Sequence, residues 1–227
     1  MTNIEEKTGG KIEGLHTFSI CDIRHPKAKT LEQEIEQTIG MYRNAIKRAK
    51  SDFYLAKARE ATKDEIALLT AVMADLRQRW HKEVGQMYSA MRDLTLVNQF
   101  TVHNIIPTAG RAVIAQWITG DNTFDADSGA NYGSLGTSNT AVANGDTTLT
   151  TETYRKATSS AATASNVAFL SNFYTATEVT GTFEEAGWHI DGTASADTGE
   201  LLSHFLTTTI SKSSTETLTA ESTLTIS

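Results

Sequence analysis

Acidic side chains gather in one loop of the sequence, where they could bind a hard cation. Asp121, Asp125 and Asp127 lie close together, beside Asn122 and Ser128. Oxygen donors of this kind are the ligands that calcium prefers. The spacing is not that of a helix-loop-helix calcium site, which also needs a glutamate at its closing position. We therefore interpret the segment as a polar loop and expect no metal.

Two adjacent glutamates and six histidines are further candidates for acid–base or zinc chemistry. Neighbouring residues of a strand point to opposite faces, so Glu184 and Glu185 cannot flank one bond as a glycosidase requires. The histidines show neither an HExxH pattern nor paired spacing (His16, His25, His81, His103, His189, His204). The sequence also contains no GxSxG element, phosphate loop or dinucleotide fingerprint. These observations favour a protein without enzymatic activity and without a cofactor.

Tryptophan is the residue type here that could bind a sugar by stacking. Trp188 follows an acidic segment in a Thr-rich region, and an exposed indole there would form a ligand platform for carbohydrate; Trp117 would be a second candidate. The interpretation that we favour for Trp188 is packing in the core, with its ring closing one end. Both interpretations stay open at this point.

Charge is unevenly distributed along the 227 residues. Residues 1–100 hold 16 Lys and Arg and 14 Asp and Glu, whereas residues 101–227 hold 4 and 13, and the whole chain has a formal net charge of −7. Binding to nucleic acid requires a basic face, which this balance does not favour. The C-terminal part is rich in Thr, Ser, Ala, Gly and Asn, so the two parts of the chain are predicted to differ in architecture.

The single Cys21 excludes an intramolecular disulfide and a cysteine-based metal cluster. No stretch approaches the roughly 18 apolar residues of a membrane span, and the first twenty residues lack the apolar run of a secretory signal. We expect a chain that is made in the cytoplasm and has no membrane partner.

Apolar spacing predicts two long helices between residues 27 and 96. Thr30 with Gln33, and Thr62 with Glu65, have the spacing of capping boxes and mark two helix starts. Apolar residues then recur every three or four positions, which keeps one stripe on one face of each helix. The short connection between the helices makes the pair antiparallel. The sequence therefore predicts a helical hairpin with coiled-coil-like packing.

Two helices by themselves leave bulky apolar side chains uncovered, so a third surface must cover them. That surface is either the rest of the chain or other subunits; we give more weight to other subunits. The predicted interface is a helical seam of eleven residues: Ile35, Ile39, Tyr42, Ile46, Phe53, Leu69, Met73, Leu76, Trp80, Val84 and Met87.

Outside the hairpin, short runs of β-forming residues alternate with loops. Strands are predicted within residues 14–23, 99–102, 167–170, 178–183, 201–205 and 218–226. Residues 109–119 are the exception and predict a short helix that ends at Gly120. Short strands separated by turn signals are typical of an antiparallel sandwich or barrel.

The order of short motifs in residues 98–227 resembles a β-sandwich domain of phage tail-fibre, baseplate and other appendage proteins. The motifs are N104IIPTAGR111, I114AQWITG120, Y132GSLGT137, T147TLTTE152 with Arg155, F183EEAGW188, and I210SK212 followed by residues 218–227. In that family an N-terminal strand returns to the first motif through a brief turn, which the hairpin would replace here. The small residues of 132–137 fit a strand that closely approaches a neighbouring backbone.

The resemblance implies an α+β chain: an antiparallel β-sandwich, Ig-like or jelly-roll-like, with a long antiparallel α-helical hairpin inserted after the first strand. Residues 1–11 would be a flexible N-terminal arm, residues 12–26 and 97–227 the sandwich domain, and residues 27–96 the inserted hairpin.

The function that this implies is that of a non-enzymatic structural protein of the phage virion. We expect a component of a tail fibre, baseplate or neck and collar that assembles with other copies of itself, as a trimer or a larger ring, and with other virion proteins. The first alternative is a capsid decoration or head-fibre protein. An alternative of another class is a carbohydrate-binding receptor module, whose partner would be a host-surface glycan.

Overall fold

The computed structural model describes residues 12–119 and 129–226. These residues form three helices and nine strands, all of whose pairings are antiparallel. The chain is thus of the α+β class, as the sequence predicted. The predicted N-terminal arm and the loop with Asp121, Asp125 and Asp127 lie outside the described residues.

The two long helices are α1 (Pro26–Ala58) and α2 (Lys63–Thr95), joined by a four-residue turn. The second predicted start is confirmed, because Thr62 Oγ1 accepts a hydrogen bond from the Glu65 amide at 3.3 Å. The first is wrong: α1 begins a turn before Thr30, with Pro26 in its first turn and His25 Nδ1 accepting from the Lys27 amide. Proline fits there because the amide that it lacks would be unpaired anyway.

The strands form two sheets. The five-stranded sheet has the order β2-β1-β9-β6-β5 and the four-stranded sheet the order β4-β3-β7-β8. The strand bounds are β1 Ile12–Asp22, β2 Leu96–His103, β3 Ala130–Gly136, β4 Glu152–Ala157, β5 Ser160–Ala164, β6 Val167–Tyr174, β7 Gly181–Ile190, β8 Glu200–Lys212 and β9 Glu216–Ile226.

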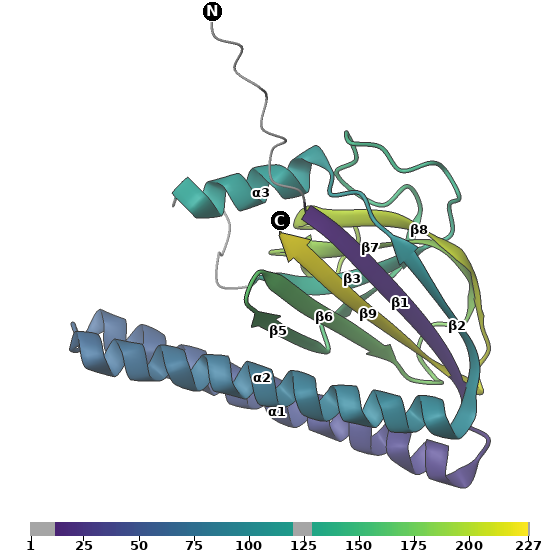
Figure 1. The fold of residues 1–227 in the computed structure, drawn as a ribbon, viewed down its shortest axis with the longest axis horizontal. Helices are drawn as coiled ribbons and strands as arrows, with labels where there is room; N and C mark the ends of the chain where they lie inside the picture. Colours follow the sequence, from purple (N-terminus) through teal and green to yellow (C-terminus); the bar gives the residue numbers. More distant parts are fainter. Residues whose placement is uncertain (1–11, 120–128, 227) are drawn as a thin grey trace, which may run out of the picture.

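The two sheets face each other across one apolar core (Figure 1). Phe18, Leu218 and Ala220 contribute from the five-stranded sheet, and Trp188 and Phe205 from the four-stranded sheet. The third helix, α3 (Thr108–Thr119), packs against β8 at one end of this core. Its Gly110 lies so close to the strand that an added Cβ would sit 2.3 Å from the Leu202 carbonyl oxygen.

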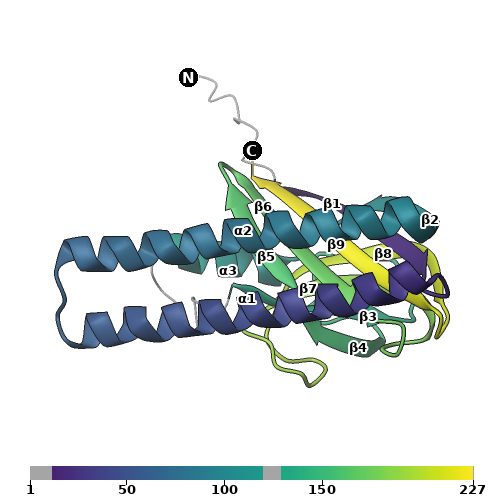
Figure 2. The same cartoon turned by 90° about the horizontal axis from the view of Figure 1, so that it is seen from below.

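The helical hairpin lies across the outer face of the five-stranded sheet and extends past its end (Figure 2). In the chain, α1 and α2 stand between β1 and β2, and these strands pair directly, with Phe18 opposite Phe100. The hairpin therefore leaves the sheet and returns to it at neighbouring strands.

Several strand boundaries differ from the predicted ones. Strands β4 and β5 were not predicted, because ETYRKA and SAATA show no apolar alternation. Strand β7 covers residues 181–190 and not 178–183, and the two register shifts in its pairing with β8 obscure the pattern. The predicted close approach in 132–137 is confirmed at Gly136, where a Cβ would lie 2.6 Å from the Thr151 carbonyl oxygen.

Among the described residues, none of the helices is long and apolar enough to cross a membrane.

Candidate assembly interface

The half of the hairpin that adjoins β1 and β2 consists of the start of α1 and the end of α2. It is held on the five-stranded sheet by apolar packing. Ile35 and Ile39 of α1, and Val84, Tyr88 and Met91 of α2, are buried in one cluster. That cluster also contains Cys21 of β1 and Phe173 of β6, which point outward from the five-stranded sheet. Burial raises the pKa of the Cys21 thiol to about 11, so this thiol is protonated at neutral pH.

Polar contacts hold α1 to strand β4 and to the segments that follow β4 and β6. Glu32 accepts a hydrogen bond from the Ala176 amide at 2.6 Å, and Glu36 lies 3.2 Å from Lys156 Nζ. Farther along the helix, Arg43 donates to the carbonyl oxygens of Ala157 and Thr158. The bonded part of α1 therefore extends to Arg43.

The second helix has its own polar contacts with the sheet. Arg92 of α2 forms an ion pair with Glu221 of β9 at 2.5 Å, and Gln78 donates to the carbonyl oxygen of Thr163 in β5. The bonds that are identified between hairpin and sheets thus come from residues 32–43 of α1 and 78–92 of α2. We call residues 44–77, which lie between Arg43 and Gln78, the hairpin tip. The end of the hairpin at which α1 and α2 are joined extends past the sheets (Figure 2).

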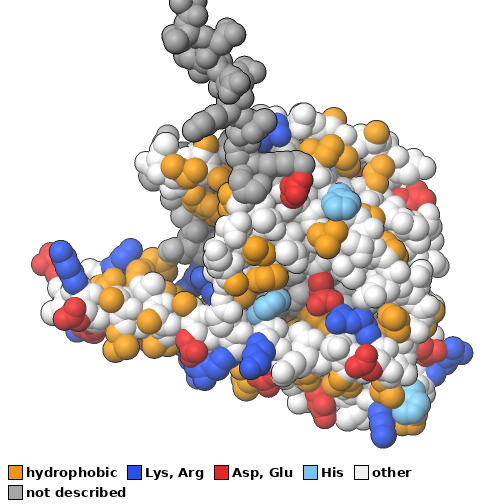
Figure 3. All heavy atoms as spheres, in the orientation of Figure 1, with side chains coloured by type: hydrophobic (Ala, Val, Ile, Leu, Met, Phe, Trp, Pro, Cys, Tyr) orange, Lys and Arg blue, Asp and Glu red, His pale blue; other side chains and the backbone are white. Residues whose placement is uncertain are grey.

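Large apolar side chains lie exposed on the hairpin tip. Leu55 is 63% exposed and Leu68 is 64% exposed, and Tyr54 and Val72 are 44% and 40% exposed. Figure 3 shows apolar side chains interspersed with charged ones on the projecting part of the hairpin. Exposed apolar side chains that gather on a projecting element are typical of a surface that another subunit covers.

The predicted seam residues divide between the two halves of the hairpin. Five of them are buried, and Trp80 also stacks on the ring of Tyr42. The buried residues are Ile35, Ile39, Ile46, Trp80 and Val84. The partly buried residues are Tyr42, Phe53, Leu69, Met73, Leu76 and Met87. The seam thus joins the two helices, and the part of it next to the strands is covered by this chain's own sheet. That other subunits contact the seam stays a prediction.

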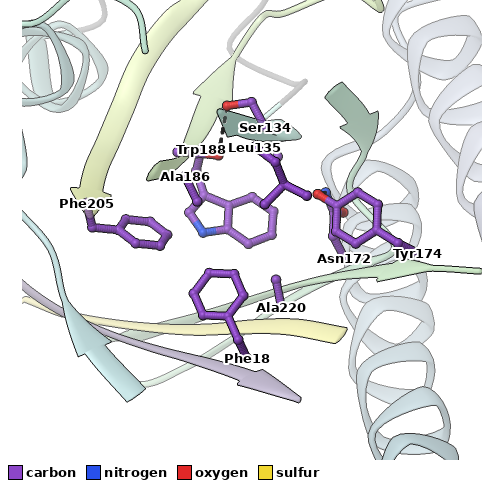
Figure 4. A pocket seen from close by; sticks show the side chains of 11 residues that line it. Phe18, Ser134, Leu135, Asn172, Tyr174, Ala186, Trp188, Phe205 and Ala220 are labelled. Carbon is purple, nitrogen blue, oxygen red and sulfur yellow. Dashed lines mark hydrogen bonds between the residues drawn. The ribbon is translucent and has the colours of Figure 1, made fainter. Parts of the chain in front are cut away.

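Trp188, the candidate ligand platform, is a core residue. It is 2% exposed, and its Nε1 donates to Ser222 Oγ at 2.7 Å. Figure 4 shows its ring between the side chains of Phe18, Phe205 and Tyr174, beside a void of about 10 Å³. Such a void holds about one water molecule. A sugar cannot stack on this ring, so the platform interpretation is wrong for Trp188. Trp117 on α3 is 37% exposed.

Buried polar and charged side chains lie on the outer face of the four-stranded sheet. Glu185 is fully buried, and its carboxylate accepts hydrogen bonds from the Thr150 and Thr151 amides at 2.9 and 2.6 Å. His204 lies between two carboxylates, with Nδ1 2.7 Å from Asp146 and Nε2 3.0 Å from Glu185. This cluster attaches the segment between β3 and β4 to β7 and β8.

A second buried cluster has the residue types of a catalytic triad but not the geometry. A triad needs the hydroxyl and the carboxylate on different nitrogens of the histidine ring. In His189 the same nitrogen, Nε2, lies 2.7 Å from Ser134 Oγ and 3.9 Å from Glu152 Oε2. Both Glu152 oxygens are bound instead by Arg155, at 2.6 and 2.7 Å. We interpret this cluster as structural.

The electrostatics of this second cluster agree with that interpretation. Burial, together with the Arg155 guanidinium and His204, lowers the pKa of His189 to about 3. His189 is therefore neutral at neutral pH, and Ser134 beside it is only 2% exposed. Among the described residues, no group of three His, Cys, Asp or Glu side chains is placed to hold a metal ion.

Sequence reasoning missed both clusters. Asp146 and His204 are 58 positions apart, and only the pairing of β7 with β8 brings His204 beside Glu185. The one local signal is Glu152 with Arg155, whose spacing of three would suggest an ion pair. Comparison with protein families, with curated proteins and with solved structures found no match.

Proposed function

We propose that this chain is a non-enzymatic structural protein of a bacteriophage virion that acts by assembling with other copies and with neighbouring virion proteins. The position we favour is a tail fibre, baseplate or neck and collar. Within this proposal the two sheets form an Ig-like or jelly-roll-like sandwich of the appendage type, and residues 27–96 are an insertion into it. The order of short motifs in residues 98–227 supports this origin.

The observation that carries the assembly part is the hairpin tip. A helix pair that only completed the core would end where the sheet ends, yet α1 and α2 continue past it with Leu55 and Leu68 largely exposed. Charged residues separate these apolar side chains, which keeps a free chain soluble while another subunit is absent. The tip is thus suited to insertion between neighbouring subunits.

The assembly can be tested by replacing apolar residues at the tip. We expect the wild-type chain to associate beyond a dimer at micromolar concentration, and the double variant Leu55→Glu/Leu68→Glu to lose that association while its melting temperature changes little. Exposed substitutions of this kind usually alter stability by about 0.5 kcal/mol or less. Light scattering coupled to size-exclusion chromatography measures the mass of the assembly. The matched control is Gln37→Glu/Gln86→Glu, because both glutamines are exposed but lie on the part of the hairpin that is bonded to the sheets.

The virion part needs a separate measurement. Antibodies against the purified chain should label the tail or neck of phage particles that contain it, as seen by immunogold electron microscopy. Labelling of the capsid surface would favour a decoration or head-fibre protein. A wild-type chain that stays monomeric, together with the absence of particle labelling, would contradict the proposal.

A further inference from the structure

Each helix of the hairpin tip carries a row of side chains that remain exposed in this chain. Within a row the residues are spaced three or four positions apart, which places them on one side of the helix. The α1 row consists of Asn44, Arg48, Ser51 and Leu55, and the α2 row consists of Leu68, Val72 and Asp75.

The two rows point away from the seam that joins the helices. Arg48 follows Ile46 of the seam by two positions, and Asp75 follows Met73 of the seam by two. Two positions turn a side chain by about 200° around a helix, so each row is directed away from the partner helix. Figure 2 looks onto the face of the hairpin that is turned away from the sheets. The rows are therefore open to a neighbouring molecule.

The α1 row borders a hollow that has the spacing of a helix-packing site. The hollow is lined by Asn44, Lys47, Arg48 and Ser51, which are positions i, i+3, i+4 and i+7 of one helix. In knobs-into-holes packing, a side chain of one helix inserts among four residues of the facing helix. Lys47 and Arg48 form no ion pair among the described residues. The hollow thus suits a helix that presents an acidic side chain.

The contacts between α1 and α2 show which of their residues lie at the same height along the hairpin. Tyr42 stacks on Trp80, and Arg59 forms an ion pair with Glu65 beside the turn. Because both helices rise about 1.5 Å per residue, the same correspondence holds between these two contacts. Every residue of the α1 row can therefore be assigned a residue of α2 at its own height.

Two complementary pairs follow from this correspondence. Arg48 is at the height of Asp75, and Leu55 is at the height of Leu68. They do not meet within one chain, because the rows point away from each other. A rotation about an axis parallel to the hairpin preserves these heights, so the pairs meet when α1 of one copy lies beside α2 of the next. Asp75 also pairs with Arg79, but its side chain is 58% exposed, so its carboxylate can accept a second cation.

We propose that copies of this chain associate through their tips, with the α1 row of one copy packed antiparallel on the α2 row of the next. Asp75 of one copy enters the hollow beside Arg48 of its neighbour, and Leu55 packs on Leu68 of the adjoining copy. The contact joins two different surfaces, so it repeats from copy to copy around a rotation axis and closes into a ring. This inference rests on the proposed function and names the partner surface of the tip.

Charge and shape both favour this arrangement over contact between two like rows. Packing α1 on α1 would bring Lys47 and Arg48 of both copies into one contact, where like charges oppose association. Packing α1 on α2 brings a cationic hollow to an acidic side chain. The sheets lie on one side of the hairpin (Figure 1), so a ring with the hairpins inside leaves the sheets outside.

The first experiment exchanges the charges of the proposed pair. Arg48→Glu should raise the dissociation constant of the assembly by a factor on the order of ten, because two acidic side chains then face each other. Arg48→Glu/Asp75→Lys restores opposite charges and should regain most of that affinity. Lys29→Glu is the matched control, because Lys29 is exposed on the bonded part of α1, and it should leave the affinity unchanged.

Sedimentation equilibrium measures these affinities, and thermal unfolding confirms that each variant is folded. An Arg48→Glu chain that associates as tightly as the Lys29→Glu chain would overturn the proposal. A double variant that recovers none of the lost affinity would overturn it as well.

The second experiment identifies which rows meet. Packed helices lie about 8–10 Å apart, which leaves facing Cα atoms within the range of a disulfide. A mixture of Leu55→Cys chains and Leu68→Cys chains should therefore form disulfide-linked dimers under mild oxidation. Either variant alone should cross-link far less, and so should the wild-type chain with its buried Cys21. Equal cross-linking in Leu55→Cys alone would place two α1 rows together and overturn the proposal.

The two experiments separate this inference from the proposed function. Suppose that Leu55→Glu/Leu68→Glu disrupts the assembly, but that the charge exchange has no effect and the cysteine mixture does not cross-link. The tip would then assemble through a different contact, which overturns this inference and leaves the proposed function standing. A wild-type chain that stays monomeric at micromolar concentration would contradict both.

Discussion

The ring of Tyr88 on α2 stacks on the ring of Phe173 on β6, with centroids 5.6 Å apart and 19° between the planes. Both side chains are buried, and Tyr88 Oη lies 3.5 Å from Ser171 Oγ. Burial raises the pKa of the Tyr88 hydroxyl well above its usual value, so the hydroxyl stays protonated at neutral pH. This pair joins the hairpin to the five-stranded sheet.

Replacing Tyr88 should therefore loosen the hairpin as well as lower stability. Tyr88→Ala should cost about 3–5 kcal/mol, the usual range for truncating a large buried aromatic residue. Tyr88→Phe keeps the stacking and should cost about 1 kcal/mol or less. Thermal unfolding measures both values, and hydrogen exchange along α1 and α2 should rise in Tyr88→Ala. Equal stability of the two variants would show that the stacked contact is not formed.

Trp80 tests the seam between the two helices. Its ring is 6% exposed and lies parallel to that of Tyr42, at 6.3 Å between centroids. Trp80→Ala should cost about 3–5 kcal/mol. The indole Nε1 is buried without a hydrogen-bond partner among the described residues, so Trp80→Phe removes that penalty and should cost much less. An unchanged melting temperature for Trp80→Ala would mean that the seam is not buried in solution.

Glu185 should be the most sensitive charged residue of the four-stranded sheet. Glu185→Ala leaves His204 and the Thr150 and Thr151 amides without their buried carboxylate, which should cost about 3–5 kcal/mol. Glu184 is adjacent but only partly buried, with Thr209 as its partner, so Glu184→Ala should change stability by about 0.5 kcal/mol or less. Urea unfolding compares the two, and limited proteolysis within residues 137–151 should accelerate only in Glu185→Ala.

Features with local signals were predictable from the sequence. The 4-3 spacing of apolar residues depends only on helix geometry, and it predicted the presence of both helices. The start of α1 was misplaced because two signals competed: Thr30 has the spacing of a cap, but Pro26 and His25 begin the helix earlier. The extra turn is stabilised by tertiary contact, since Ala28 is fully buried in the cluster beneath the hairpin.

Features that depend on strand pairing were not predictable. The sequence favoured a core position for Trp188, but it could not show that the ring is enclosed between Phe18 of one sheet and Phe205 of the other. The contact between β2 and β8 likewise becomes visible only in the structure, because it depends on how the two sheets pack.

Two buried histidines should make the fold sensitive to mild acid. The pKa of His16 is lowered to about 3 by burial, as is that of His189, which also faces Arg155. In the unfolded chain a histidine titrates near 6.5, so between pH 6.5 and 3 the unfolded state binds protons that the folded state does not. The contribution of these histidines to the free energy of unfolding is therefore fully present above about pH 6.5. It falls as the pH decreases, by about 2 kcal/mol per histidine at pH 5.

The measurement is the free energy of unfolding at pH 7 and pH 5 for the wild-type chain, His16→Gln, His189→Gln and the double variant. Each substitution removes one titrating group, so each should flatten the pH dependence by about half, and the double variant should remove most of it. His16 stacks on Phe205 at 3.7 Å between centroids, so His16→Gln also lowers stability at pH 7. The deciding quantity is therefore the difference between the free energies of unfolding at pH 7 and at pH 5 for each variant. Equal differences in the wild-type chain and the double variant would show that other groups control the acid response.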